Sequence, residues 1–149
     1  MSKLDFPNPP LTIGQQATLT NGITYQWDGE VWFSLSTGRL YLMAGALAGS
    51  PPAALSCGFY VSVFTATFPA VLTGSQGYAK TAPAAQADCP ITLKGAAMAT
   101  MRFAAGAHTA TFLLASATVI HPGDRIEVLS PGTVDLNFAD FTWTLEATL

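Results

Sequence analysis

The last nine residues of the chain, FTWTLEATL (141–149), carry the clearest periodic pattern in the sequence. Large apolar side chains alternate there with polar ones: Phe141, Trp143 and Leu145 alternate with Thr142, Thr144 and Glu146. Successive side chains of a β-strand point to opposite faces of a sheet. We therefore expect a strand with one face in a hydrophobic core and the other face in solvent.

Similar segments precede it. Five stretches rich in β-branched and aromatic residues are separated by turns that contain Gly, Pro or Asp: 59–68, 90–94, 98–104, 108–119 and 124–130. Short strands about every ten residues, with no amphipathic helical stripe, are typical of an antiparallel sandwich or jelly roll. The fold class predicted for residues 57–149 is therefore all-β, an antiparallel β-sandwich or jelly-roll-like domain.

The N-terminal part contains two hairpin signals within NGITYQWDGEVW (21–32). Asn21-Gly22 and Asp28-Gly29 suit two-residue type I′ turns, which need positive φ at both central residues. They separate three candidate strands, 16–20, 23–27 and 30–35. We predict a small three-stranded β-meander within residues 1–37.

Tyr25, Trp27 and Trp32 are the most prominent candidate binding residues. Two-residue turns would place Tyr25 opposite Trp32, with Trp27 diagonal to Trp32 on the same face. The same counting adds Thr18 and Ile23 to that face. The aromatic rings form either a stacking platform for a sugar or proline, or the core of a module too small to have another. We favour the core interpretation.

Residues 38–56, GRLYLMAGALAGSPPAALS, are apolar and rich in Gly, Ala and Pro. This composition favours a connector that lies against protein, with a helical turn near Leu47. Tyr41, Leu42 and Met43, at the start of this connector, are candidate partner contacts. The predicted organisation is thus a meander module at 1–37, a connector at 38–56 and a sandwich at 57–149.

The composition indicates a protein that works in contact with other protein. Only 10% of the residues are charged while half are apolar, which leaves few charges to cover a monomer. We expect a homo-oligomer, with a trimer as the predicted form. Scattered basic residues and a net charge of −3 argue against nucleic-acid binding. Gly45, Gly49 and Pro51 interrupt the longest apolar stretch, so no membrane span is expected, and MSKLDFPNPP lacks the apolar core of a secretory signal.

No arrangement of residues points to catalysis. His108 begins a predicted strand and His121 precedes a proline, and neither belongs to a nucleophile or metal motif. Asp124 could join His121 at an ion, but an Asp after Gly is more often a turn residue. Cys57 and Cys89 are expected to be thiols rather than a disulfide. We predict no enzyme activity, no metal and no cofactor. The scattered acids show no pairing, which argues against the alternative of a polysaccharide hydrolase or lyase.

The segment FPNPPLTIGQQATLTNGITYQWDGEVW resembles a small Trp-containing module that recurs in bacteriophage virion proteins. The matching positions are Pro7, Pro9, Pro10, Gly14, Gln15, Asn21, Gly22, Tyr25, Trp27, Asp28, Gly29 and Trp32. The remainder is similar to a β domain of phage tail-fibre and head-surface proteins. Its matching positions are Phe68, Pro69, Ala70, Gly74, Ser75, Ala82, Pro83, Gly106, Phe112, Gly123, Asp124, Pro131 and Asp135. LKGAAMATMRF (93–103) departs from the usual Asn-Gly hairpin.

The resemblance implies a structural protein of the virion, assembled in the host cytoplasm. The function that we expect is capsid decoration: a non-enzymatic cement protein that contacts the major capsid protein or other virion proteins and stabilises the particle. The alternative is a short tail fibre or spike that binds a host-surface saccharide through Trp27 and Trp32 or through sandwich loops.

Overall fold

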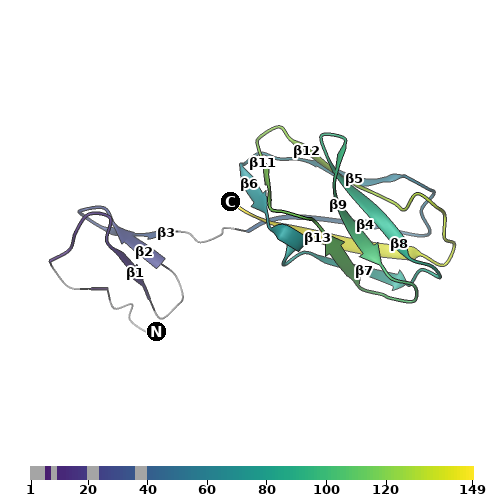
Figure 1. Ribbon diagram of the computed structural model, residues 1–149, viewed down its shortest axis with the longest axis horizontal. Helices are drawn as coiled ribbons and strands as arrows, with labels where there is room; N and C mark the ends of the chain where they lie inside the picture. The colour runs from purple at the N-terminus through teal and green to yellow at the C-terminus, as the bar shows by residue number, and fades with distance from the viewer. Residues whose placement is uncertain (1–5, 8–9, 20–23, 36–39) are drawn as a thin grey trace. The chain divides into compact units, whose positions relative to one another are not determined.

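The computed structural model describes residues 6–7, 10–19, 24–35 and 40–149. The chain divides into two compact units, Met1–Arg39 and Leu40–Leu149, and each unit is built of antiparallel β-strands (Figure 1). The described residues include thirteen strands and one short 3₁₀ helix, η1 (Ala70–Leu72). The predicted all-β class is therefore confirmed.

The first unit is a three-stranded meander. Its strands are β1 (Gln16–Thr18), β2 (Thr24–Trp27) and β3 (Trp32–Leu35), paired in the order β1-β2-β3. Trp27 lies opposite Trp32, and Tyr25 lies opposite Ser34. The expected pairing of Tyr25 with Trp32 was wrong, but the shift is by two residues and so keeps Tyr25, Trp27 and Trp32 on one face.

The register differs because the second hairpin loop is longer than predicted. Asp28 Oδ1 accepts the backbone N–H groups of Glu30 and Val31, both at 2.8 Å, and the Asp28 N–H donates to the Val31 carbonyl at 3.2 Å. These bonds organise residues 28–31 into a four-residue loop in place of a two-residue turn.

The pairing of β1 with β2 also differs from the prediction. Ala17 lies opposite Tyr25, and Thr18 lies opposite Thr24 with their hydroxyls 2.8 Å apart. Thr18 is therefore on the face opposite to the one predicted, because the odd-numbered connection 19–23 shifts the register by one residue. Asn21-Gly22 and Ile23 lie outside the described residues.

The second unit is a sandwich of two antiparallel sheets. Its strands are β4 (Leu40–Leu47), β5 (Ser56–Val61), β6 (Ala66–Phe68), β7 (Gln76–Thr81), β8 (Ala87–Leu93), β9 (Ala96–Phe103), β10 (Ala110–Leu113), β11 (Thr118–Ile120), β12 (Arg125–Leu129) and β13 (Ala139–Thr148). One sheet has the order β10-β9-β8-β12-β5, and the other has the order β11-β6-β13-β4 with β7 also paired to β13. β4 and β5 are thus edge strands of different sheets.

The predicted connector is part of the sandwich. Residues 40–47 form β4, which pairs with β13 from Leu40 opposite Thr148 to Leu47 opposite Phe141. No helical turn forms near Leu47, where the strand ends. Burial alternates along this stretch as expected for a strand, with Met43 inward and the alanines outward. The boundary between the two units falls between residues 39 and 40.

Two segments predicted as single strands are each divided between the sheets. Residues 59–68 contribute to β5 and β6, and residues 108–119 contribute to β10 and β11. The first break occurs at Ser62, whose N–H donates to the Asp124 carbonyl and whose carbonyl accepts the Gly123 N–H, both at 2.8 Å. The chain crosses from one sheet to the other at this point.

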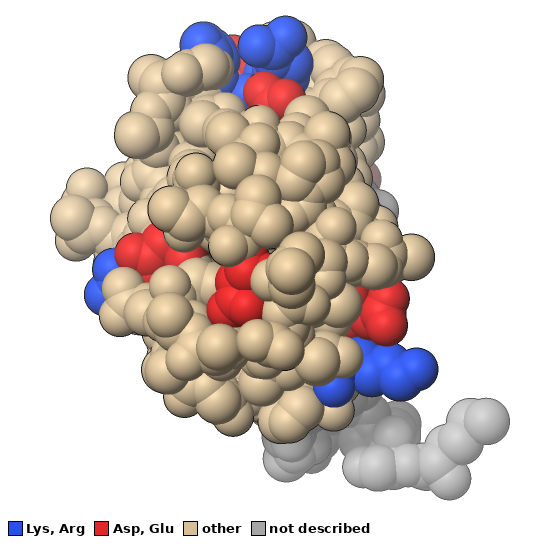
Figure 2. Space-filling model, turned by 90° about the vertical axis from the view of Figure 1, so that its right-hand side faces the viewer, with Lys and Arg blue, Asp and Glu red and all other residues tan. Residues whose placement is uncertain are grey.

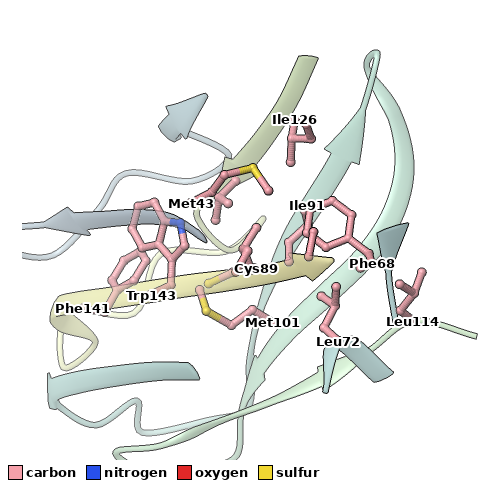
Figure 3. Packing of buried hydrophobic residues seen from close by; sticks show 14 of the residues in the cluster. Met43, Phe68, Leu72, Cys89, Ile91, Met101, Leu114, Ile126, Phe141 and Trp143 are labelled. Carbon is pink, nitrogen blue, oxygen red and sulfur yellow. The ribbon is translucent and has the colours of Figure 1, made fainter. Parts of the chain in front are cut away.

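The core lies between the two sheets and is rich in aromatic rings. The predicted inward residues of β13 (Phe141, Trp143 and Leu145) are all buried, and Figure 3 shows the first two side by side. Phe138 stacks on Phe141 at a centroid distance of 4.8 Å. The two cysteines are free thiols, as expected. Burial raises the pKa of Cys89 to about 12 and that of Cys57 to about 11, so both stay protonated at neutral pH.

Candidate binding surfaces

The aromatic cluster of the first unit contains a fourth ring. Phe6 stacks on Trp32 at a centroid distance of 5.4 Å and meets Tyr25 edge-on at 5.1 Å, while Trp27 lies 5.7 Å from Trp32. Phe6 belongs to the Pro-rich lead and immediately precedes Pro7. Phe6 was not predicted as a member of the cluster, because an aromatic residue before a proline does not by itself indicate which rings it contacts.

All four rings are half-buried. They contact one another, and none of them is fully buried or fully open. This is how a sheet of three short strands shields aromatic surface when its own strands cannot enclose it. The arrangement favours the interpretation of these rings as a small core.

The three candidate residues of β4 take different positions. Leu42 points outward and is exposed, whereas Tyr41 is half-buried and meets Phe64 edge-on at 5.9 Å. Met43 is 2% exposed and belongs to the sandwich core. The prediction of Met43 as a partner contact was therefore wrong, because alternation along the strand directs its side chain inward.

Four exposed apolar side chains lie along β5 and the loop that follows it. Phe59, Val61, Val63 and Phe64 are each more than half exposed, and we call these four residues the β5 patch. Phe59 and Val61 lie opposite Glu127 and Arg125 of β12, which border the patch. The tyrosine between them, Tyr60, donates its hydroxyl proton to the Ala44 carbonyl of β4, which ties the two edge strands together.

The second edge strand also presents an uncharged surface. The outward residues of β4 are Leu40, Leu42, Ala44 and Ala46, all of them exposed. In the view of Figure 2, Lys, Arg, Asp and Glu form a few separate groups within a broad neutral surface. An uncharged edge strand lacks the usual protection against pairing with another chain.

A groove of about 260 Å³ lies on the outer face of the sheet that contains β13. Tyr78 and Gln76 of β7 line it together with Thr142 and Thr144 of β13, and Thr109 contributes from the far side of β7. Tyr78 is 52% exposed. None of these residues was predicted from the sequence, because they come together only through strand pairing.

The ionisable groups singled out from the sequence have structural partners. Asp124 pairs with Lys94 Nζ at 2.7 Å and accepts the His121 N–H at 3.0 Å, and these interactions lower its pKa. The expected turn role of Asp124 is what the structure shows. His108 Nδ1 lies 2.8 Å from the Ala79 carbonyl.

The described residues provide neither a metal-binding cluster nor a membrane-spanning helix. Among them, no three His, Cys, Asp or Glu side chains are placed to hold a metal ion. In the same part of the chain, no helix is long and apolar enough to cross a membrane.

Comparison with protein-family models finds no match for this chain, and comparison with curated proteins finds none either. The surfaces described above are therefore the structural basis for a functional proposal.

Proposed function

We propose that this protein is a non-enzymatic structural component of a phage virion that decorates and cements the capsid, as a homotrimer, through protein–protein contacts. The observation that carries the proposal is the neutral, apolar surface of the two edge strands, namely the β5 patch and the outward residues of β4. The resemblance of residues 6–32 to a virion module supports the same assignment.

The size of the β5 patch suits a contact that is repeated many times. At their observed exposure, its four side chains present on the order of 400 Å² of apolar surface. Burying that area yields about 10 kcal/mol, which is comparable with the cost of association, roughly 4–15 kcal/mol. One patch alone therefore binds weakly. Three patches in a trimer that engage a repeating capsid lattice gain affinity through effective concentration.

The proposed mechanism is thermodynamic. A protein that binds only the assembled form of a particle stabilises that form by mass action. The partners are the major capsid protein or other virion proteins, and the location is the virion, assembled in the host cytoplasm.

The test mixes purified protein with expanded, undecorated capsids and, separately, with host cells. We expect co-sedimentation with capsids, and a trimer in analytical ultracentrifugation at micromolar concentration. Phe59→Asp should reduce the affinity for capsids and the association constant of the trimer, each by at least about tenfold, because it places a charge within the patch. Leu136→Asp is the matched control, since Leu136 is 82% exposed outside the patch and should tolerate the charge.

Two outcomes would count against the proposal. Binding to cells but not to capsids would favour the tail-fibre alternative. A strict monomer whose binding to capsids is unchanged by the Phe59→Asp substitution would show that the β5 patch is not the contact.

A further inference from the structure

We propose that the groove on the outer face of β7 and β13 binds one unit of a neutral saccharide, with Tyr78 as the stacking ring. The groove adjoins the outward residues of β4, since Ala44 lies opposite Thr144 and Ala46 lies opposite Thr142, but it includes none of them. The saccharide proposal does not rest on the assembly proposal. Three features support it: the side chains that strand pairing assembles, the absence of charge among the described groove-lining residues, and the packing that holds β7 in place.

Strand pairing brings the polar groups of the groove together. Tyr78 lies opposite Thr142 and Gln76 lies opposite Thr144, and all four side chains lie on the outer face of the sheet. On the other side of β7, Thr109 forms a bridge with Tyr78. One aromatic ring is therefore surrounded by three hydroxyls and one amide.

These groups match the chemistry of a sugar ring. The C–H groups on one face of a pyranose pack against an aromatic ring, while its hydroxyls both donate and accept hydrogen bonds. Threonine hydroxyls and the glutamine amide can also do both. Pockets for small molecules combine apolar or aromatic surface with a few such polar groups. The volume of about 260 Å³ accommodates a single sugar unit.

The groove-lining side chains indicate that the ligand is neutral. The described residues that line the groove include no Lys, Arg, Asp, Glu or His. The next outward position on β7 is Lys80, which lies opposite Asp140 by the register of β7 with β13. Recognition of a carboxylate or phosphate uses Arg or Lys as a direct donor, and the groove itself offers none.

The ring of Tyr78 is held in place from one side. The His108 imidazole lies nearly parallel to it, with an interplanar angle of 22° and a centroid distance of 5.9 Å. His108 Nδ1 is 2.8 Å from the Ala79 carbonyl, and it must be the donor because a carbonyl can only accept. This bond anchors the imidazole to the backbone of the same strand that carries Tyr78.

The floor of the groove is held by close packing. Gly77 separates Gln76 from Tyr78, and a Cβ added to it would lie 2.8 Å from the Ala110 Cβ and 2.9 Å from the Met101 Sδ. The backbone of β7 therefore sits directly on the core at this point. A groove that is already formed binds a ligand with little loss of conformational entropy.

The experiment screens the full-length protein against an array of neutral and acidic oligosaccharides and then titrates the best binder by NMR. We expect neutral glycans to shift the amide signals of Tyr78, Thr109 and Thr142. Tyr78→Ala should weaken binding at least about tenfold. Tyr78→Phe should retain most of the affinity because it keeps the ring, and Thr142→Val should give an intermediate loss. Phe33→Ala is the control, since it removes an exposed ring that lies in the first unit and outside both the groove and the β5 patch.

Thermal melts of each variant separate loss of binding from loss of folding, and Tyr78→Phe keeps the test valid if the alanine variant is unstable. The proposal is overturned if no neutral glycan binds at millimolar concentration, if only acidic glycans bind, or if Phe33→Ala removes binding while Tyr78→Ala does not. Loss of capsid binding in Tyr78→Ala, with no glycan binding by the parent, would make the groove a protein contact. Capsid binding that survives Tyr78→Ala leaves the assembly proposal intact whatever the glycan result.

Discussion

The two units of this chain shield their aromatic side chains in different ways. In the sandwich, Phe103, Phe138 and Phe141 pack between two sheets and are fully buried. In the meander, Trp27 and Trp32 lie against each other on one face of a single sheet and remain half-buried. A sheet of three short strands has no second layer to close its core. The stability of the sandwich should therefore depend on how closely its core side chains pack. The stability of the meander should depend on contacts between a few aromatic rings.

The first prediction tests fit in the sandwich. Gly45 of β4 lies opposite Trp143 of β13, and a Cβ added to Gly45 would lie 2.8 Å from Cε2 of the indole, 2.9 Å from Cη2 and closer still to Cζ2. Gly45→Ala should lower the free energy of unfolding of the sandwich by about 3 kcal/mol, because the buried indole has no room to move. Urea denaturation followed by far-UV circular dichroism measures the change.

Gly132→Ala is the matched control in the same unit. A Cβ at Gly132 would meet no atom within 4 Å, and its φ is not positive. The same substitution should leave stability unchanged or slightly raised. If both variants lose the same free energy of unfolding, the glycine at position 45 is explained by its backbone freedom and not by contact with the indole.

The second prediction concerns the meander. Trp27→Ala removes the ring contact with Trp32, and because Trp27 is only half-buried the cost should be about 2 kcal/mol, roughly half that of a fully buried Trp. Amide hydrogen exchange should accelerate in β2 and β3, while β8 and β13 serve as internal references. Val31→Ala is the control, since Val31 is exposed in the 28–31 loop. Unchanged exchange together with lost binding to cells would instead make the rings a ligand platform.

The strands were predictable where the pattern is local. Side-chain direction alternates along any strand, so residues 141–149 indicated both β13 and its buried face before any partner was known. Hairpin registers were less predictable. The Asp28 carboxylate accepts two backbone N–H groups and lengthens one loop to four residues. The dipeptide Asp28-Gly29 alone predicts neither these hydrogen bonds nor the resulting pairing of Trp27 with Trp32.

The missed elements depend on distant partners. Residues 40–47 were predicted as part of a connector because the strand that pairs with them, β13, lies about a hundred residues away in sequence. β7 contains a glycine where alternation expects a large inward residue, and Met101 and Ala110 from other strands fill that space. The Tyr78 groove was missed for the same reason. Its residues meet only after β7 has paired with β13.

The third prediction has the smallest effect and compares acid sensitivity in the two units. Asp28 of the meander accepts N–H groups from Val31 and Glu30, and Asp135 of the sandwich accepts those of Asn137, Ala84 and Ala85. These backbone hydrogen bonds lower the pKa of both carboxyl groups.

A carboxyl group whose pKa is lower in the folded state stabilises the protein above its unfolded pKa, and this contribution is lost as the pH falls through the folded value. Stability should therefore be constant from about pH 7 to 5 and decline below about pH 4. Asp28→Asn should flatten this decline in the meander while keeping the loop, since an amide oxygen still accepts both bonds. Asp135→Asn should flatten it in the sandwich at a cost near neutral pH, because Asp135 accepts Asn137 N–H at Oδ1 and Ala84 N–H at Oδ2, and an amide has only one acceptor oxygen. Urea midpoints measured between about pH 2.5 and 7 give the curves. If Asp135→Asn declines as steeply as the parent, the acid sensitivity of the sandwich belongs to other carboxylates, such as Asp88 and Asp124, whose pKa values are also lowered. An unchanged decline in Asp28→Asn would show that Asp28 does not set the acid sensitivity of the meander.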